Sequence, residues 1–176
     1  MAGGAPDAAD VIRLLDLQPH PAEGGYFVET YRADENLPAA ALPGRYGGPR
    51  AHGTAIYYLL TADNVSAMHR LASDEVFHHY LGDAVEMLHL FADGNAASVV
   101  LGRDLGAGER PQVVVPRGVW QGARLRPGSR FALMGTTVAP GFDFDDFELG
   151  GRDALTAAYP AHGDMIAVLT PEGAPS

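Results

Sequence analysis

Most of the chain alternates between apolar and polar residues in short runs, as β-strands with one buried face do. Nine such runs lie between residues 26 and 138, and Gly, Pro, Asp or Asn separates nearly all of them. The runs are 26–31, 54–60, 65–71, 76–81, 85–91, 97–102, 112–115, 120–125 and 131–138. Turn residues such as Gly82-Asp83 suit tight hairpins. The pattern predicts an all-β domain whose antiparallel strands form a barrel or a double-sheet jelly roll.

Helical spacing occurs near the two ends of this strand region. Residues 10–17 place apolar side chains on one helical face, with Asp10 as the expected N-cap and Pro19 beyond the end. Residues 151–159 predict a second helix, which Pro160 closes. Residues 33–50, rich in Pro, Gly and Ala, predict a long exposed loop placed to cover the mouth of a cavity.

The length of 176 residues, without a linker or an internal repeat, predicts one domain over residues 11–170. Residues 1–10 and 171–176 are expected to be flexible tails. The first ten residues have neither the basic start nor the apolar core of a signal peptide, and they are too polar for a membrane span. A cytoplasmic location is the resulting expectation.

Charge and cysteine content restrict the chemistry. The formal net charge of -10 argues against nucleic acid or an anionic membrane surface as the partner, because both require clustered Lys and Arg. A small molecule is the expected partner. The absence of cysteine excludes disulfides, thiolate zinc sites and a cysteine nucleophile. Motifs for nucleotide hydrolysis and for serine esterases are also missing.

The segment from His69 to Gly82 combines three histidines with two carboxylates in a strand-like pattern. Side chains two positions apart share one face of a strand, so we expect Glu75, Phe77 and His79 to point the same way. Imidazole and carboxylate groups on one face can bind a divalent metal or transfer protons. This segment is therefore the candidate reaction centre.

The spacing of His69-x-Leu71, Glu75 and Gly82 resembles the first motif of the cupin superfamily, whose usual form is Gly, five residues, His-x-His, three or four residues, Glu, six residues, Gly. Residues 114–121 resemble the second motif, Pro-x-Gly-x-x-His. Segments 23–32, 73–75 and 139–148 are similar to the small single-domain cupins of largely unassigned function. The resemblance extends from about residue 11 to 170. It implies a double-stranded β-helix jelly roll, a homodimer and a pocket in the barrel mouth.

Two positions depart from the metal-binding form of these motifs. Leu71 stands where a metallocupin has its second histidine, and Gln121 stands where it has the histidine of the second motif. The candidate metal ligands that remain are His69, Glu75 and Gln121, with His78 as a substitute, for manganese, iron, nickel or zinc. Imidazole is a better ligand for such metals than an amide oxygen. The sequence therefore supports a tight transition-metal site at most as strongly as it supports a metal-free site.

A further similarity links residues 25–31 to the Gly-Phe-Phe-x-Glu-Ser/Thr-Phe/Tyr segment of dTDP-4-keto-sugar 3,5-epimerases, which are metal-free cupins with a His base and a Tyr acid. The resemblance implies that His69, oriented by Glu75 or Asp74, removes a proton and that Tyr26 or Tyr57 returns it. The remaining candidate substrate-binding residues are Glu23, Glu29, Trp120 and Gln121.

Structural interpretations of the same residues stay open. His69, although favoured as a site residue, is also compatible with a buried, hydrogen-bonded core position, and Trp120 with a core aromatic. We expect His89 to pack in or beside the core. His20 lies in a loop-like context that favours a surface position. Asp143, Asp145, Asp146 and Glu148 alternate with phenylalanines and do not follow a calcium-loop spacing, so we expect their charges to face water.

The leading functional hypothesis is an isomerase or epimerase acting on a sugar nucleotide or a similar carbonyl compound, with His69, Glu75 and Tyr26 as catalytic residues. A metal-dependent oxygenase, decarboxylase or lyase is the first alternative. A non-catalytic small-molecule binding protein is the second, because one fold supports many functions.

Overall fold

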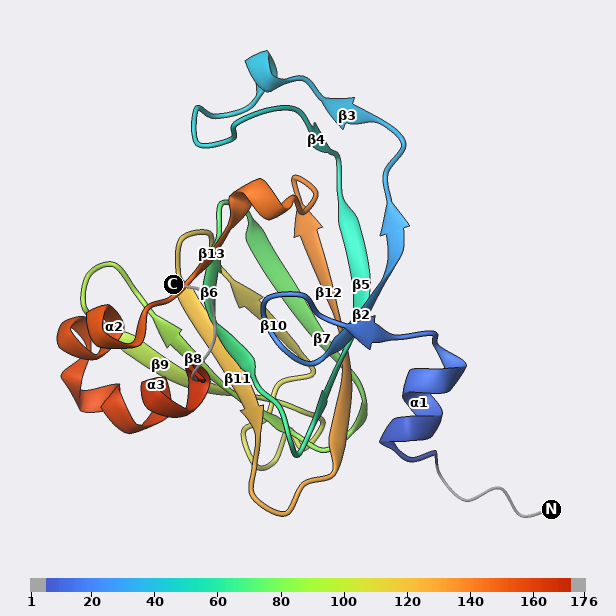
Figure 1. Ribbon diagram of the computed structural model, residues 1–176, viewed down its shortest axis with the longest axis vertical. Coiled ribbons are helices and arrows are strands. Elements are labelled where there is room, and N and C mark those ends of the chain that lie inside the picture. Colours follow the sequence, from blue (N-terminus) through green and yellow to red (C-terminus); the bar gives the residue numbers. More distant parts are fainter. Residues whose placement is uncertain (1–5, 172–176) are drawn as a thin grey trace.

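A computed structural model describes residues 6–171 of the chain as two facing β-sheets with helices packed on their outer sides, and a small two-stranded sheet projects from one end (Figure 1). The six-stranded sheet has the order β1-β2-β5-β12-β7-β10, and the five-stranded sheet has the order β13-β6-β11-β8-β9. Strands pair antiparallel within each sheet. Of the expected flexible tails, residues 1–10 and 171–176, the segments 1–5 and 172–176 lie outside the described residues, whereas residues 8–10 belong to the first helix. The all-β jelly-roll class is confirmed.

The nine predicted strands are all present, with ends that differ from the prediction by no more than two residues. They are β2 (Tyr26–Arg32), β5 (Thr54–Thr61), β6 (Ser66–Leu71), β7 (Asp74–Gly82), β8 (Val85–Leu90), β9 (Ala96–Leu101), β10 (Gln112–Val115), β11 (Trp120–Leu125) and β12 (Phe131–Ala139). The prediction missed the shorter strands β1 (Gln18–Pro19), β3 (Asn36–Leu37), β4 (Arg50–Ala51) and β13 (Phe147–Leu149). These runs are too short to show a period of two.

The helices differ from the prediction at their ends. Helix α1 spans Ala8–Leu14, and its N-cap is Asp7, which accepts a hydrogen bond from the Asp10 backbone N–H. Asp10 therefore lies in the first turn, where a carboxylate favours the helix dipole. The second predicted helix is α2 (Arg152–Ala158), and a further helix, α3 (Gly163–Leu169), follows Pro160.

Three hydrophobic clusters connect these layers. The largest fills the barrel between the sheets and includes Phe77, Met87 and Leu101. A second joins Met68 and Leu88 on the outer face of the five-stranded sheet to Ile166 and Leu169 of α3. The third packs Val11 of α1 against Leu59 and Leu133. Helices therefore cover the outside of the sheets while side chains fill the inside.

The predicted loop 33–50 is a small arm that projects from one end of the barrel (Figure 1). It contains β3, β4 and the 3₁₀ turn Ala39–Ala41. No residue from 33 to 53 lines the cavity described below, so the expected covering role is wrong.

No helix among residues 6–171 is long and apolar enough to span a membrane. The cytoplasmic location and the domain boundaries stay predictions.

Candidate functional site

A cavity of about 260 Å³ opens at the end of the barrel where β2, β6 and β12 finish and where β5 and β7 begin. Its walls are mostly apolar, and its polar side chains come from several strands and from the segment after β12. The lining residues are His20, Glu23, Phe27, Glu29, Arg32, Thr54, Ile56, His69, Leu71, Glu75, Thr136, Val138, Phe142, Asp143, Phe144 and Phe147. Such a concave, mostly apolar site with a few polar groups is typical of small-molecule binding.

Strand alternation explains how His69 and Glu75 reach this cavity. On β6, His69 and Leu71 line the cavity, whereas Met68 packs in the cluster under α3. On β7, Glu75, Phe77 and His79 are buried while their neighbours are more exposed. This shared face of β7 is confirmed as predicted, although His79 lies farther along the strand and does not line the cavity.

Glu23 reaches the cavity through a two-glycine turn. Gly24 and Gly25 have φ angles of 94° and 69°, in the left-handed region that favours glycine. A Cβ atom on Gly24 would collide with the carbonyl oxygen of Val65, so the turn lies directly against the chain before β6. The Ser66 hydroxyl donates a hydrogen bond to Glu23 and holds its carboxylate in place.

His69 is the centre of the polar cluster. Its Nδ1 lies 2.7 Å from the carbonyl oxygen of Ala67. Because a carbonyl only accepts, Nδ1 carries a proton and donates it to this bond. Its Nε2 lies 3.9 Å from Glu23 Oε2 and 4.0 Å from Glu75 Oε2. Burial lowers the pKa of His69, but the nearby carboxylates of Glu23 and Glu75 and the Ala67 carbonyl raise it to about 9. His69 is therefore an imidazolium at neutral pH.

His20 is a site residue that the sequence analysis placed at the surface. Its Nδ1 accepts hydrogen bonds from the backbone N–H groups of Glu23, at 2.8 Å, and Ala22, at 3.3 Å. Its Nε2 lies 4.0 Å from Glu23 Oε2. Burial lowers the pKa of His20 despite the nearby Glu23 carboxylate. The side chain is therefore neutral with its proton on Nε2, and the three-residue spacing from Glu23 was its only sequence signal.

Gln121 supports Glu75 from beneath the cavity. Its Nε2 donates a hydrogen bond of 2.7 Å to Glu75 Oε2. A carboxylate only accepts, so the amide nitrogen must face Glu75 and the carbonyl oxygen must point elsewhere. That buried oxygen has no hydrogen-bond partner among the described residues. The expected substrate contact of Gln121 is corrected, because Gln121 does not line the cavity.

The side chains do not fit the metal centre that the cupin motifs suggest. Leu71 lines the cavity where a second histidine would stand, and Gln121 turns its amide nitrogen toward Glu75. Among residues 6–171, no three His, Cys, Asp or Glu side chains are grouped so that they hold a metal ion. The donor set therefore favours proton transfer over transition-metal binding.

His78 does not join His69 and Glu75. Its ring bonds to Thr137 and Gln112 and stacks on Tyr80, with ring centroids 6.3 Å apart. These contacts lie on the face of β7 opposite to Glu75, because the two residues are three positions apart. The expected placement of His78 as a metal ligand is therefore wrong.

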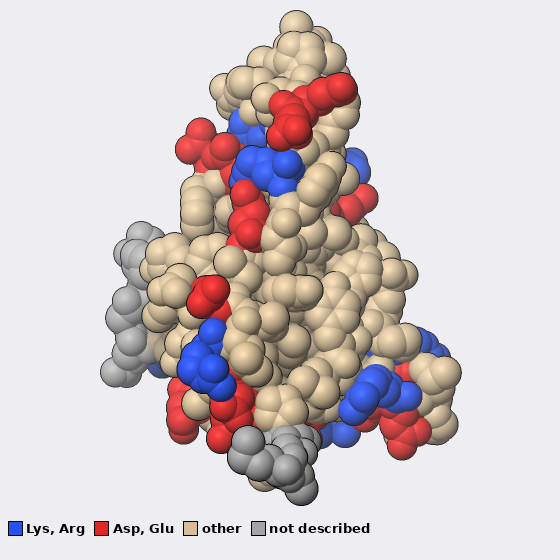
Figure 2. All heavy atoms as spheres, turned by 90° about the vertical axis from the view of Figure 1, so that its right-hand side faces the viewer, with Lys and Arg blue, Asp and Glu red and all other residues tan. Residues whose placement is uncertain are grey.

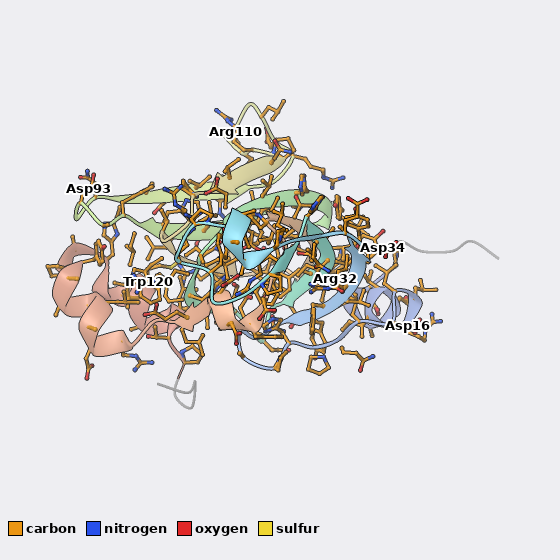
Figure 3. The ribbon with its side chains drawn as sticks, turned by 90° about the horizontal axis from the view of Figure 1, so that it is seen from above. Asp16, Arg32, Asp34, Asp93, Arg110 and Trp120 are labelled. Carbon is orange, nitrogen blue, oxygen red and sulfur yellow. The ribbon has the colours of Figure 1, made fainter. Side chains whose placement is uncertain are left out.

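Three predicted aromatic residues also lie away from the cavity. Tyr26 and Tyr57 pack in the cluster between α1 and the six-stranded sheet. Trp120 packs in the cluster of α2 and α3 and stacks against the Arg70 guanidinium, 4.4 Å from its ring centroid. Figure 3 shows Trp120 on the side of these helices, apart from Arg32 on β2. Their placement in the pocket is corrected, because each faces the outside of its sheet.

Glu29 does line the cavity, in an ion pair at its rim. Arg32 donates to both carboxylate oxygens of Glu29, at 3.0 and 2.8 Å, and to the carbonyl oxygen of Phe142 at 3.2 Å.

The position of Asp146 differs from the expectation that its charge faces water. Instead of facing water, it forms a buried bidentate pair with Arg50, with both hydrogen bonds at 2.7 Å. This pair connects the segment after β12 to the base of the arm.

Comparison with known proteins gives matches over most of the chain. Residues 9–150 match the family model Cupin_5, described as "Cupin superfamily (DUF985)". The uncharacterized protein YML079W of Saccharomyces cerevisiae is 34% identical over 142 residues, which cover 76% of this chain and 71% of the yeast protein.

Two solved structures are similar across almost their full length. Protein SO0799 from Shewanella oneidensis has a TM-score of 0.84 and 35% identity, covering 95% of this chain and 99% of that one. A hypothetical protein from Leishmania major has a TM-score of 0.84 and 30% identity, covering 95% and 100%. Neither description states an activity.

Proposed function

We propose that this chain, which belongs to the Cupin_5 (DUF985) family of the cupin superfamily, binds a small polar metabolite in its barrel and catalyses proton transfer next to a carbonyl group. Isomerases and epimerases perform this chemistry. The observation that supports the proposal most is the position of His69 Nε2, within 4.0 Å of two carboxylates inside a largely apolar cavity. An acid and two bases are thereby available to one bound molecule.

The raised pKa of His69 changes the role that the epimerase resemblance implies for it. At about 9, this pKa keeps the ring protonated at neutral pH, so His69 is poorly suited to remove a proton. In our proposal, Nε2–H donates a hydrogen bond to the substrate carbonyl oxygen and stabilises the negative charge of the enolate. The Glu75 carboxylate removes the proton from the adjacent carbon, and the protonated Glu75 carboxyl group then returns that proton to the enolate, which restores the starting carboxylate.

The supporting residues make this assignment geometrically consistent. Gln121 orients Glu75, Ser66 orients Glu23 and the Ala67 carbonyl orients His69. Side chains held by such hydrogen bonds need little reorganisation during proton transfer. No tyrosine acid takes part in this proposal, because Tyr26 and Tyr57 face the other side of the sheet. The Glu23 carboxylate instead helps to hold His69 in its protonated form.

Exchange of hydrogen for deuterium tests the proposed chemistry. The protein is incubated in D₂O with a set of small hydroxyketones and ketosugars, and NMR detects deuterium at the carbon next to the carbonyl. We expect at least one compound to exchange. His69→Asn and Glu75→Gln should each reduce its exchange rate by about 10²–10⁴-fold. Exchange should survive EDTA, since no step uses a metal.

His78→Asn is the matched control, because it makes the same change on the opposite side of β7. Circular dichroism and thermal unfolding establish that each variant is folded. Unchanged exchange in folded His69→Asn and Glu75→Gln proteins would refute the catalytic roles. Absence of exchange with every compound would refute the proposed reaction.

A non-catalytic binding protein is the second candidate function. The apolar walls formed by Phe27, Ile56, Leu71 and Val138 favour it, because they provide binding surface without reactive groups. In that case a ligand would stabilise the protein thermally without exchanging protons. Thermal shift measurements on the same compounds separate this outcome from catalysis.

We also propose that the chain forms a homodimer through the outer face of the six-stranded sheet. Tyr31, Tyr80 and Val114 are exposed large side chains on strands of this sheet. Figure 2 shows few charged side chains across the middle of the side that carries α1 and β2. An exposed apolar face of this kind commonly marks a protein interface. Light scattering should give a dimer mass, and Val114→Glu should shift it toward the monomer.

A further inference from the structure

We propose that the cavity selects a small organic cation, a molecule with one protonated amino group, and rejects phosphorylated or carboxylated ligands. This inference rests on the proposed function in that it takes the cavity as the binding site. It narrows the ligand class and argues against a sugar nucleotide, whose phosphates are anionic. The argument comes from the charges, the walls and the volume of the cavity.

The inner end of the cavity holds more carboxylate than cation. Glu23 and Glu75 are both largely buried, with side chains 12% and 9% exposed. Among residues 6–171, His69 is the one cationic side chain beside them, because burial lowers the pKa of His20 and keeps it neutral. One negative charge therefore remains without a counter-charge in a poorly hydrated environment. A cationic ligand group would supply that counter-charge.

The rim does not reverse this balance. Arg32 lines the cavity, but its guanidinium is engaged by both oxygens of Glu29 and by the Phe142 carbonyl. Asp143 adds another carboxylate, which also faces Arg32 and Arg50, and Arg50 is held by Asp146. The titratable lining residues thus comprise four carboxylates, namely Glu23, Glu29, Glu75 and Asp143, against the cations Arg32 and His69. An anionic ligand would meet repulsion at both ends.

The walls suit a cation as well as an apolar body. Phe27, Phe142, Phe144 and Phe147 line the cavity, and the last three have ring centroids between 5.0 and 6.4 Å from one another. Aromatic rings attract ammonium groups through their quadrupole, and they do so more strongly where water is excluded. The aromatic cluster and the excess carboxylates therefore favour the same kind of ligand.

The volume restricts the ligand to a compact molecule. At about 260 Å³, the cavity is smaller than the roughly 300–1,000 Å³ of sites that hold drug-sized ligands. A monosaccharide or a similar small skeleton fits this limit better than a nucleotide. An amino group on such a skeleton satisfies the charge, the wall chemistry and the size together.

Matched probes that share one skeleton test the inference. The first set is cyclohexylamine, cyclohexanol and cyclohexanecarboxylate, and the second is glucosamine, glucose and glucose 6-phosphate. Each is titrated into the folded protein at pH 7 in an amine-free buffer, with amide NMR shifts of cavity residues as the readout. We expect the amine of at least one set to bind at least tenfold more tightly than its neutral partner, and the anion to bind most weakly.

A charge-removing variant at the rim adds an internal control. Asp143→Asn retains a side-chain oxygen to cap the following 3₁₀ turn, and it should weaken amine binding about 3- to 10-fold without affecting the alcohol. Asp145→Asn makes the same charge change at an exposed side chain that does not line the cavity, and should have a smaller effect. Equal effects of the two variants would show only a general influence of net charge and would overturn local selection.

Other outcomes also overturn the inference. The inference fails if an anion binds as tightly as the amine with the same skeleton. It also fails if no amine shifts the NMR signals of cavity residues. The deuterium exchange experiment is separate from these titrations. Proton exchange on a phosphorylated substrate would leave the proposed reaction intact and refute the charge preference. Amine binding without proton exchange on any compound would support the charge preference and refute the proposed reaction.

Discussion

Two histidines in one row of the barrel interior have opposite properties. His69 on β6 and His89 on β8 both lie directly opposite Gln121 on β11, and both are buried, with 2% and 3% of their surface exposed. The pKa of His69 is raised to about 9, whereas burial lowers the pKa of His89 to about 4. The same fold position thus holds one charged and one neutral ring.

The difference lies in what surrounds each ring. Glu23 and Glu75 both approach His69 Nε2, whereas His89 Nε2 has no hydrogen-bond partner among the described residues and sits near the apolar barrel core. Burial penalises the protonated ring at both places, and two carboxylates outweigh that penalty at only one. A buried histidine is therefore a candidate for proton transfer because of its partners, and burial alone does not identify it.

The largest expected effect on stability comes from removing the His69 ring, with removal of the His89 ring as the comparison. His69→Leu should lower the free energy of unfolding by about 3–5 kcal/mol at pH 7, because Glu23 and Glu75 lose their cation while staying buried. His89→Leu should change it by less than about 1 kcal/mol, since it removes an unpaired polar atom and keeps the volume apolar. Urea denaturation measures both. Equal losses would break the comparison.

The two rings should also give stability opposite dependences on pH. The stabilisation from His69 is complete below pH 6.5 and is lost as pH rises toward 9, because its pKa is higher in the folded state. His89 has the opposite effect: burial of its neutral ring costs little above pH 6.5, but stability falls as pH drops from 6.5 toward 4, because the unfolded state then binds a proton more readily. Over its own pH range, each change amounts to about 3 kcal/mol. Unfolding measured at pH 5, 6.5 and 9 should show the alkaline loss reduced in His69→Gln and the acid loss reduced in His89→Leu.

A smaller change should sharpen the role of the carboxylates. Glu75→Gln keeps a side-chain oxygen for Gln121 but removes one of the two charges beside His69. The pKa of His69 should fall by about 1–2, and that of His89 should stay unchanged. NMR titration of the two imidazoles measures this directly. An unchanged His69 pKa would mean that Glu75 does not control the ring.

The smallest effect is expected at His78, which serves as the exposed reference. In dilute protein, where the proposed dimer is dissociated, His78→Asn should alter the free energy of unfolding by no more than about 0.5 kcal/mol, because its ring lies on the outer face of β7 and is partly exposed there. Chemical denaturation beside the His69 and His89 variants provides the test. A large loss in the dissociated protein would contradict the exposed position of His78.

Strand alternation made much of the fold and part of the site predictable. It gave the nine long strands and the shared face of Glu75, Phe77 and His79, whereas the placement of His69 in the barrel followed from the cupin resemblance. The same rule also exposes the errors. Tyr26 is three positions from Glu29, and Trp120 is next to Gln121, so neither pair shares a face on a regular strand. Glu29 lines the cavity and Gln121 is buried beside Glu75. Tyr26 and Trp120 must therefore lie on the outer faces of their sheets.

Other parts of the site depend on contacts between distant segments. His20 enters the cavity from β1 and the turn that follows, and a strand of two residues shows no period. Asp146 is buried by its pair with Arg50, which lies 96 positions earlier in the chain. The charge of His69 depends on Glu23, which reaches it through the folded two-glycine turn. A pattern within one segment carries no information about such partners.

Leu71 and Gln121 are the two positions at which substitution would convert this barrel into a metal-binding cupin, or the reverse. Gln121→His alone removes the amide that orients Glu75, and Leu71→His alone places an imidazole in an apolar wall with no ion to bind. Either single step loses a favourable interaction before any new one forms. Divergence between the two chemistries therefore favours paired mutations, and an engineer who wants a metalloenzyme on this scaffold should introduce both histidines at once.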